Sequence, residues 1–150
     1  MKKFSFTLQK ILEIKEQMLD NLKIELGGLN NNLARIEASI NNLKAQLQKI
    51  EKEFIEKSSV LISVGEMTYY KMLTSSILKQ IENKEEEKCI VLRKIEAKRQ
   101  EIISMNMEIS SLEKLKEKEK DKYNKTLNRN EEIFIEEFVS NNSVSKRYAI

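Results

Sequence analysis

The sequence is poor in the residues that form turns, metal sites and disulfides. Its 150 residues include no proline, histidine or tryptophan, only three glycines, and a single cysteine, Cys89. With so few turn-forming residues, the chain cannot build the many tight turns of a β-sandwich or barrel. Without histidine it lacks the base of a Ser-His-Asp triad and the ordinary zinc ligand. A single cysteine forms no internal disulfide, which favours a reducing compartment.

Long apolar runs and a charge excess of one sign are also missing. No stretch approaches the roughly 20 apolar residues of a membrane span, and no signal-peptide core follows the basic start of the chain. The 27 basic and 24 acidic residues are mixed throughout, whereas a nucleic-acid-binding protein concentrates its positive charge. We therefore expect neither direct membrane insertion nor nucleic-acid binding. Charge-rich chains with almost no helix breakers are typical of coiled coils.

A seven-residue hydrophobic repeat runs through the first third of the chain. Steps of four and three residues give Leu8, Leu12, Lys15, Leu19, Leu22, Leu26, Leu29, Leu33, Ile36, Ile40, Leu43, Leu47, Ile50 and Phe54, of which only Lys15 is polar. This period predicts a left-handed coiled-coil helix over about residues 6–57. Thr7 is the predicted N-cap, with Phe6 and Ile11 as a hydrophobic staple. The glycine pair at 27–28 is either a local soft spot or a close approach of the partner helix.

A turn near residues 58–63 is predicted to lead into a second helix. Ser63 and Glu66 have the spacing of a capping box, which marks a helix start. The second helix is expected over about residues 64–139, and residues 140–150 lose the periodicity and are expected to fray. Its seam is predicted at Met67, Tyr70, Thr74, Ile77, Ile81, Val91, Ile95, Lys98, Ile102, Met105, Ile109 and Leu112.

Two long helices joined by a short turn can bury their seams only by running antiparallel. The predicted fold class is therefore an all-α, long antiparallel two-helix coiled-coil hairpin in a single domain, with the second helix overhanging the first. Folding about residue 62 sets Ile36 and Ile40 against the wholly polar stretch 82–88. Either the stems of Lys88 and Lys84 cover this apolar stripe, or the register is shifted, or the stripe is available to a third helix.

All aromatic side chains fall near the two predicted ends of the hairpin. They are Phe54, Tyr69 and Tyr70 beside the turn, and Phe4, Phe6, Tyr123, Phe134, Phe138 and Tyr148 at or beyond the open end. Because aromatics are enriched at interface hot spots, one interpretation is a partner at each end. The other is that Phe54 and Tyr70 close the seam while Phe4 and Phe6 cover the open end. The overhang offers Phe134 and Phe138 no helix to pack on, which favours partner binding for these two.

Catalysis finds no support in the sequence. The carboxylates are spaced regularly along solvated helix faces, and the glycine pair lacks the Lys-Ser/Thr of a phosphate-binding loop. Two packed helices also enclose no pocket of the kind that catalysis needs. We predict that the protein is not an enzyme and has no catalytic residue, cofactor or metal.

Three stretches are similar to a known family. They are Phe4-x-Phe6-x-Leu8-x-x-Ile11-Leu12 followed by Lys15; Ser63-Val64-x-Glu66-Met67-x-x-Tyr70-x-x-Leu73; and Leu112-Glu113-Lys114-Leu115-Lys116 with Tyr123 and Ile135-Glu136-Glu137-Phe138. In order and spacing they resemble the FliJ family, the small coiled-coil protein of the bacterial flagellar type III export apparatus. The similarity spans nearly the whole chain.

The resemblance implies a non-enzymatic stalk or adaptor similar to the central stalk of rotary ATPases. Its open end would insert into the export ATPase hexamer through Phe4, Phe6, Lys15, Tyr123, Phe134 and Phe138. Its tip would contact the cytoplasmic domain of the membrane export gate through Leu47, Ile50, Phe54, Tyr70, Leu73 and Ile77. Export chaperones are further expected partners. The chain alone would be a monomer, located in the cytoplasm and peripherally associated with the membrane, with a role in motility and chemotaxis.

Other classes of function stay open. One alternative is a helical-hairpin chaperone that binds secretion substrates through the stripe of Ile36 and Ile40 and through the turn. Another is a structural coiled coil that forms homodimers through the same stripe. A stalk protein of a non-flagellar type III secretion system would show a closely related sequence pattern.

Overall fold

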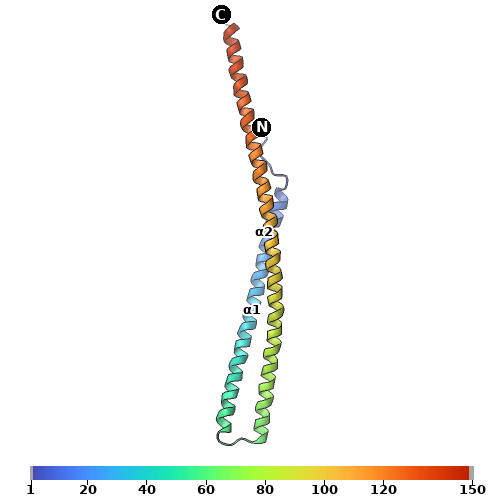
Figure 1. Ribbon diagram of the computed structural model, residues 1–150, viewed down its shortest axis with the longest axis vertical. Coiled ribbons are helices and arrows are strands. Elements are labelled where there is room, and N and C mark those ends of the chain that lie inside the picture. The colour runs from blue at the N-terminus through green and yellow to red at the C-terminus, as the bar shows by residue number, and fades with distance from the viewer. Residues whose placement is uncertain (1, 149–150) are drawn as a thin grey trace. The chain divides into compact units, whose positions relative to one another are not determined.

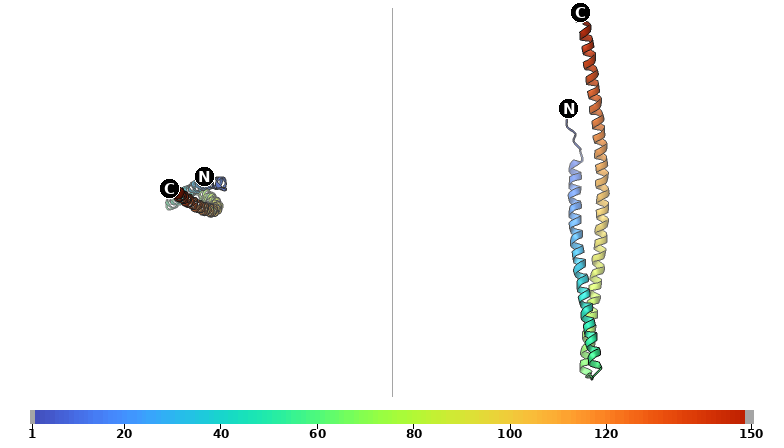
Figure 2. Two further views of the ribbon diagram at one scale, coloured as in Figure 1. Left: turned by 90° about the horizontal axis from the view of Figure 1, so that it is seen from above. Right: turned by 90° about the vertical axis from the view of Figure 1, so that its left-hand side faces the viewer.

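The computed structural model describes residues 2–148, and over this range the chain forms two α-helices and no strand. α1 spans Gln9–Ser58 and α2 spans Val64–Tyr148, with a short loop between them (Figure 1). The helices run in opposite directions and pack against each other, as the right-hand view of Figure 2 also shows. The predicted all-α two-helix hairpin is therefore confirmed.

The first helix begins later than the sequence predicted. α1 starts at Gln9, because the Gln9 amide donates to the Phe6 carbonyl at 3.0 Å and closes a turn before the helix. Thr7 lies inside this turn, so the expected start near residue 6 with Thr7 as the N-cap is wrong. Phe6 is buried and Ile11 is 44% exposed, and the staple contact between these two side chains stays a prediction.

The second helix continues beyond its predicted end. α2 runs to Tyr148, so the expected end of the helix near residue 139 is wrong, while the expected fraying of residues 140–148 stays a prediction. Serine and asparagine are weak helix formers but do not break a helix as proline does, and this stretch contains no glycine or proline. Lys146 and Arg147 lie in the last turn, where positive charge favours the helix C-terminus. Residues 149–150 of the predicted frayed tail lie outside the described residues.

The turn between the helices matches the prediction. The Ser63 hydroxyl accepts a hydrogen bond from the Glu66 amide at 3.1 Å, which is the predicted capping interaction at the start of α2. Just beyond the end of α1, the Ser59 hydroxyl donates to the Glu56 carbonyl at 2.7 Å. Both helix ends at the turn therefore have partners for backbone groups that a helix leaves unpaired.

The described residues divide into two compact units, each of which contains part of both helices. Residues 2–19 and 104–148 belong to the terminal unit, and residues 20–103 form the turn unit.

The largest buried cluster lies in the turn unit. It consists of Ile36, Ile40, Val91 and Ile95, with Leu26, Leu29 and Leu33 packed against it. Between Ile81 and Val91, the seam positions of α2 are occupied by Lys84 and Lys88, which are both half-buried. Lys88 Nζ lies 3.6 Å from Glu37 Oε1. Ile36 and Ile40 are 6% and 4% exposed, so the apolar stripe is not available to a third helix. Coverage by lysine stems is the interpretation that fits.

The helix register in the turn unit follows the predicted fold about residue 62. Lys98 Nζ lies 2.7 Å from Glu25 Oε2, and the rings of Phe54 and Tyr70 are 5.6 Å apart. In each pair the mean of the two residue numbers is close to 62, the predicted centre of the turn. Nearly every predicted seam position in this unit is buried or half-buried; Met67, in the first turn of α2, is 38% exposed.

Candidate partner-binding surfaces

In the terminal unit, the segment before α1 packs onto α2. The Phe4 ring lies 5.6 Å from the Tyr123 ring, and the Tyr123 hydroxyl donates to the Lys2 carbonyl at 2.7 Å. Phe6 is 7% exposed. The structure therefore places Phe4, Phe6 and Tyr123 in one region, where they hold the N-terminal segment against α2. The interpretation that Phe6 covers this end is confirmed, while ATPase contact by these residues stays a prediction.

Lys15 is the polar residue of the first-helix seam, and it is paired within the terminal unit. Its Nζ lies 2.6 Å from Glu108 Oε2, so α1 and α2 are joined here by an ion pair instead of an apolar contact. The Lys15 side chain is 29% exposed. A partner that needed this charge would have to compete with Glu108.

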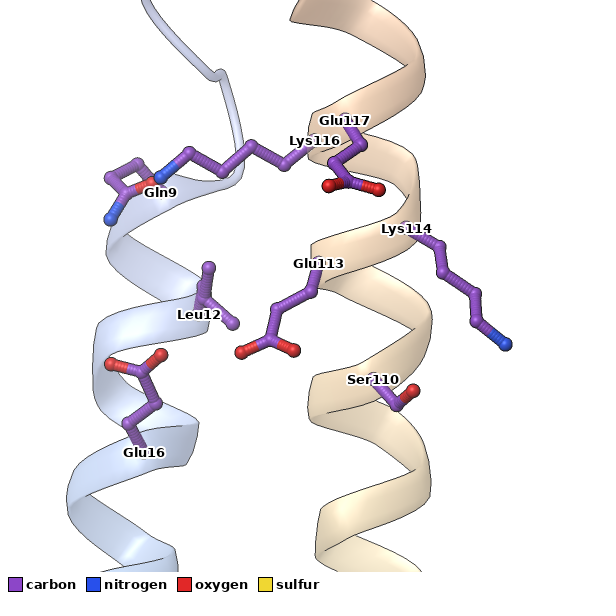
Figure 3. Close-up of a pocket in the computed structure, with 8 residues that line it drawn as sticks. All are labelled: Gln9, Leu12, Glu16, Ser110, Glu113, Lys114, Lys116 and Glu117. Carbon is purple, nitrogen blue, oxygen red and sulfur yellow. The ribbon is translucent and has the colours of Figure 1, made fainter.

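A groove between the helices of the terminal unit lies next to this ion pair. Its lining residues are Gln9, Leu12, Glu16, Ser110, Glu113, Lys114, Lys116 and Glu117 (Figure 3). Figure 3 shows Leu12 and Glu113 pointing into the space between the helices, while Lys114 points away. The groove is open to solvent and its charges are mixed. Among the described residues, no group of acidic or cysteine side chains could hold a metal ion.

The last part of α2, residues 128–148, has no buried side chain, and we call it the overhang. Phe134 and Phe138 are 69% and 59% exposed, and their spacing of four places them on the same side of the helix. Ile135 and Val139 beside them are also exposed. Sequence reasoning identified the two phenylalanines but missed these aliphatic neighbours, because they do not follow the seam.

The overhang also has a charge pattern of its own. Residues 130–145 carry four glutamates and no basic side chain, although the chain as a whole is slightly basic. The overhang thus combines exposed apolar side chains with negative charge. Contiguous exposed apolar surface of this kind marks interaction sites on soluble proteins.

In the turn unit, the residues predicted to contact the export gate lie in the seam. Tyr70 and Ile77 are 7% and 5% exposed. Leu47, Ile50, Phe54 and Leu73 are half-buried. The Phe54 and Tyr70 rings meet edge to face, so the interpretation that this pair closes the seam is confirmed. These six side chains hold the helices together, and their contact with a gate stays a prediction.

Other apolar side chains near the turn are the exposed ones. Ile55, Val60, Leu61, Val64, Tyr69 and Met72 are between 61% and 89% exposed. A separate groove, open to solvent, is lined by Phe54, Tyr70 and Leu78 together with four polar residues, Glu51, Lys71, Thr74 and Ser75. Sequence reasoning identified Tyr69 beside the turn but missed the exposed aliphatic side chains and Met72 around it, because they lie outside the seam. The available signal was the apolar run at residues 60–62 inside a turn that solvent surrounds.

Two lysines of the turn unit have perturbed acidity. Hydrogen bonding with the Tyr70 side chain raises the pKa of Lys57, whose Nζ lies 5.5 Å from the centre of that ring. A hydrogen bond to Glu25 likewise raises the pKa of Lys98 above its ordinary 10.5. Each interaction stabilises the fold below pH 10.5 and is lost as the pH rises through the raised value. Neither lysine is poised for proton transfer near neutral pH.

Two paired helices with open grooves and exposed apolar side chains at both ends define a coiled-coil structural or adaptor protein. No helix within residues 2–148 is apolar over a length that would cross a bilayer. The family model described as "Flagellar FliJ protein" matches residues 4–147. The chain therefore belongs to the FliJ family, a structural and adaptor family associated with flagellar protein export. No curated protein and no solved structure shows significant similarity to the chain.

Proposed function

We propose that the protein is a non-enzymatic stalk and adaptor of the flagellar type III export apparatus. In this proposal its terminal unit inserts into the ring of the export ATPase, and its turn unit contacts the cytoplasmic domain of the membrane export gate. It would act in the cytoplasm, peripherally associated with the membrane at the export apparatus. Contact with export chaperones and a monomeric state of the isolated chain are parts of the same proposal.

The exposure of Phe134 and Phe138 is the observation that carries the proposal. Two large aromatic side chains face solvent on a helix that remains unbroken to Tyr148. Covering each ring in a complex would contribute on the order of 1.5–3 kcal/mol from apolar burial. A single helix is about 10–12 Å wide with its side chains, which is narrow enough to enter the pore of a ring. The overhang is therefore suited to this role.

The chaperone and homodimer alternatives depend mainly on an apolar stripe that is buried. A chaperone or a homodimer that used the stripe of Ile36 and Ile40 would need these side chains to be accessible, and both are buried. The family match is to a flagellar protein, which favours flagellar export over a non-flagellar secretion system.

The ATPase contact can be tested by capturing the cognate export ATPase on the purified chain. We expect Phe134→Ala combined with Phe138→Ala to weaken capture at least tenfold, because about 1.4 kcal/mol of lost apolar contact already corresponds to that factor. Circular dichroism should show unchanged helix content, since both rings are exposed. Wild-type capture by this double variant would refute the proposed contact.

The turn unit provides the matched control and the second half of the test. Tyr69→Ala combined with Met72→Ala also removes two exposed side chains, which are 61% and 69% exposed in the wild type. This variant should capture the ATPase normally and bind the isolated cytoplasmic domain of the export gate more weakly. If the two double variants weakened both partners equally, the assignment of one partner to each unit would be wrong.

A further inference from the structure

The middle of α1 contains a run of residues that do not favour a helix. Gly27 and Gly28 are followed by Asn30, Asn31 and Asn32, and all five are exposed. Glycine destabilises a helix interior relative to alanine, and asparagine is also a weak helix former. The helix is nevertheless continuous from Gln9 to Ser58, so its continuity through this run has to come from packing against α2.

Packing does not explain the two glycines. A Cβ atom added at Gly27 or Gly28 would meet no atom within 4 Å, so the partner helix does not approach them closely. The described chain also contains no residue with positive φ, so no special backbone conformation requires glycine here. The interpretation of the pair as a close approach of the partner helix is therefore wrong. A local soft spot is the interpretation that remains.

Apolar burial at this level of the hairpin is lower than in the buried cluster, against which Leu26 and Leu29 pack. Leu26 and Leu29 occupy seam positions next to the glycines and are only half-buried. Two to four turns further along α1, Ile36 and Ile40 are 6% and 4% exposed. The segment that most needs support from tertiary packing thus receives less of it than its neighbour.

The facing residues of α2 add little apolar contact. Lys98 occupies the seam position there and pairs with Glu25 at 2.7 Å, and ion pairs with this much solvent exposure contribute little to stability. A groove open to solvent lies beside Gly28 of α1 and Ala97 of α2, the two smallest residues of its lining. The helices are therefore joined at this level mainly by their half-buried leucines and by charge.

α2 has no matching weakness. Residues 92–101 opposite the glycines are rich in leucine, lysine, arginine, glutamate and alanine, all strong helix formers. We infer that residues 26–32 of α1 form a joint, a segment that bends or opens locally while α2 stays helical. Such a joint would let one helix of the hairpin yield to a bending load without separating the pair. This inference concerns the chain itself and does not depend on which partners bind it.

Amide hydrogen exchange of the purified chain tests the joint. In the wild type we expect residues 26–32 to exchange faster than residues 36–43 of α1 and residues 92–98 of α2, because local opening governs exchange. Gly27→Ala and Gly28→Ala should each slow exchange in the segment about fivefold, which corresponds to about 1 kcal/mol. Equal protection of residues 26–32 and 36–43 in the wild type would overturn the inference.

Gly65→Ala is the matched control. It makes the same substitution in the first turn of α2, where the added Cβ would meet only the Ser63 hydroxyl, at 3.9 Å. It should leave the exchange of residues 26–32 unchanged. If Gly65→Ala slowed that segment as much as Gly27→Ala or Gly28→Ala does, the effect would be global stabilisation and no joint would exist.

Swimming of cells that carry the variants tests whether the joint is used. We expect Gly27→Ala combined with Gly28→Ala to leave capture of the export ATPase normal and to reduce the swimming halo. Cells that carry Gly65→Ala should swim as the wild type does. A full halo with the doubly substituted chain, in a background where deleting the gene stops swimming, would overturn a functional joint. Normal swimming after deletion of the gene would instead refute the proposed function, and the exchange result would still decide whether the joint exists.

Discussion

Ile95 and Ile135 lie on the same helix, carry the same side chain, and are found in opposite environments. Ile95 belongs to the cluster of the turn unit and is 3% exposed, whereas Ile135 lies on the overhang of the terminal unit and is 59% exposed. α1 faces the first residue and no described residue covers the second. An apolar side chain on a long helix is therefore part of the core or part of a candidate interface according to whether the second helix reaches it.

The largest expected effect on stability is the difference between substituting Ile95 and substituting Ile135. Ile95→Ala should lower the free energy of unfolding by about 2–4 kcal/mol, because it removes a buried side chain and leaves a cavity in the main cluster. Ile135→Ala makes the same chemical change on the same helix and should alter it by less than about 0.5 kcal/mol. Urea unfolding followed by circular dichroism measures both values. Equal losses would mean that residues 128–148 are folded against something and are not an overhang.

A smaller effect is expected where the N-terminal segment packs on α2. Tyr123→Phe keeps the ring contact with Phe4 and removes the hydrogen bond to the Lys2 carbonyl, which is worth about 0.5–1.5 kcal/mol. The loss should be local, so residues 2–8 should exchange their amides or be cleaved by protease severalfold faster. Unchanged protection of residues 2–8 would show that Phe4 and Phe6 alone hold this segment. Tyr148→Phe is the control, since Tyr148 is 85% exposed.

The smallest effect on stability is expected from deleting most of the overhang, although this deletion is the largest change to the chain. Deleting residues 129–150 removes a segment whose described side chains are all exposed, so the free energy of unfolding should change by less than about 0.5 kcal/mol. The same deletion should abolish ATPase capture if the proposed function is right. A clear loss of thermal stability would show that the overhang supports the hairpin, and it would weaken the contrast between the two isoleucines.

The seam illustrates how much of the fold could be predicted. Every first-helix seam position, including Lys15, is buried or half-buried, because a period of 3.5 residues keeps one face toward the partner. Lys84 and Lys88 were left out of the predicted seam since their type is polar, but the predicted register placed them opposite Ile40 and Ile36, and both are half-buried. Helix ends were less predictable. The start of α1 depends on a turn closed by Phe6, and the end of α2 depends on the sum of weak propensities.

The candidate sites were predictable in location and, in part, in exposure. Phe134 is exposed, as the lack of a facing helix predicted, and Phe6 and Tyr70 are buried, which is one of the two interpretations that the sequence left open. Residue type alone does not distinguish the buried Tyr70 from the exposed Tyr69. The exposed apolar side chains at residues 60–61 and at Ile135 were missed because they lie outside the seam.

By itself, the sequence determined two long helices, the turn between them and the antiparallel register, because periodicity, capping and the lack of helix breakers act locally along the chain. Only the tertiary structure decided which side chains remain for partners, because exposure depends on where the other helix ends and on how the N-terminal segment covers α2. The tertiary structure also showed that a close approach of α2 does not explain the glycine pair of α1. That conclusion required knowing that no atom of α2 comes within 4 Å of the Cβ position at either glycine.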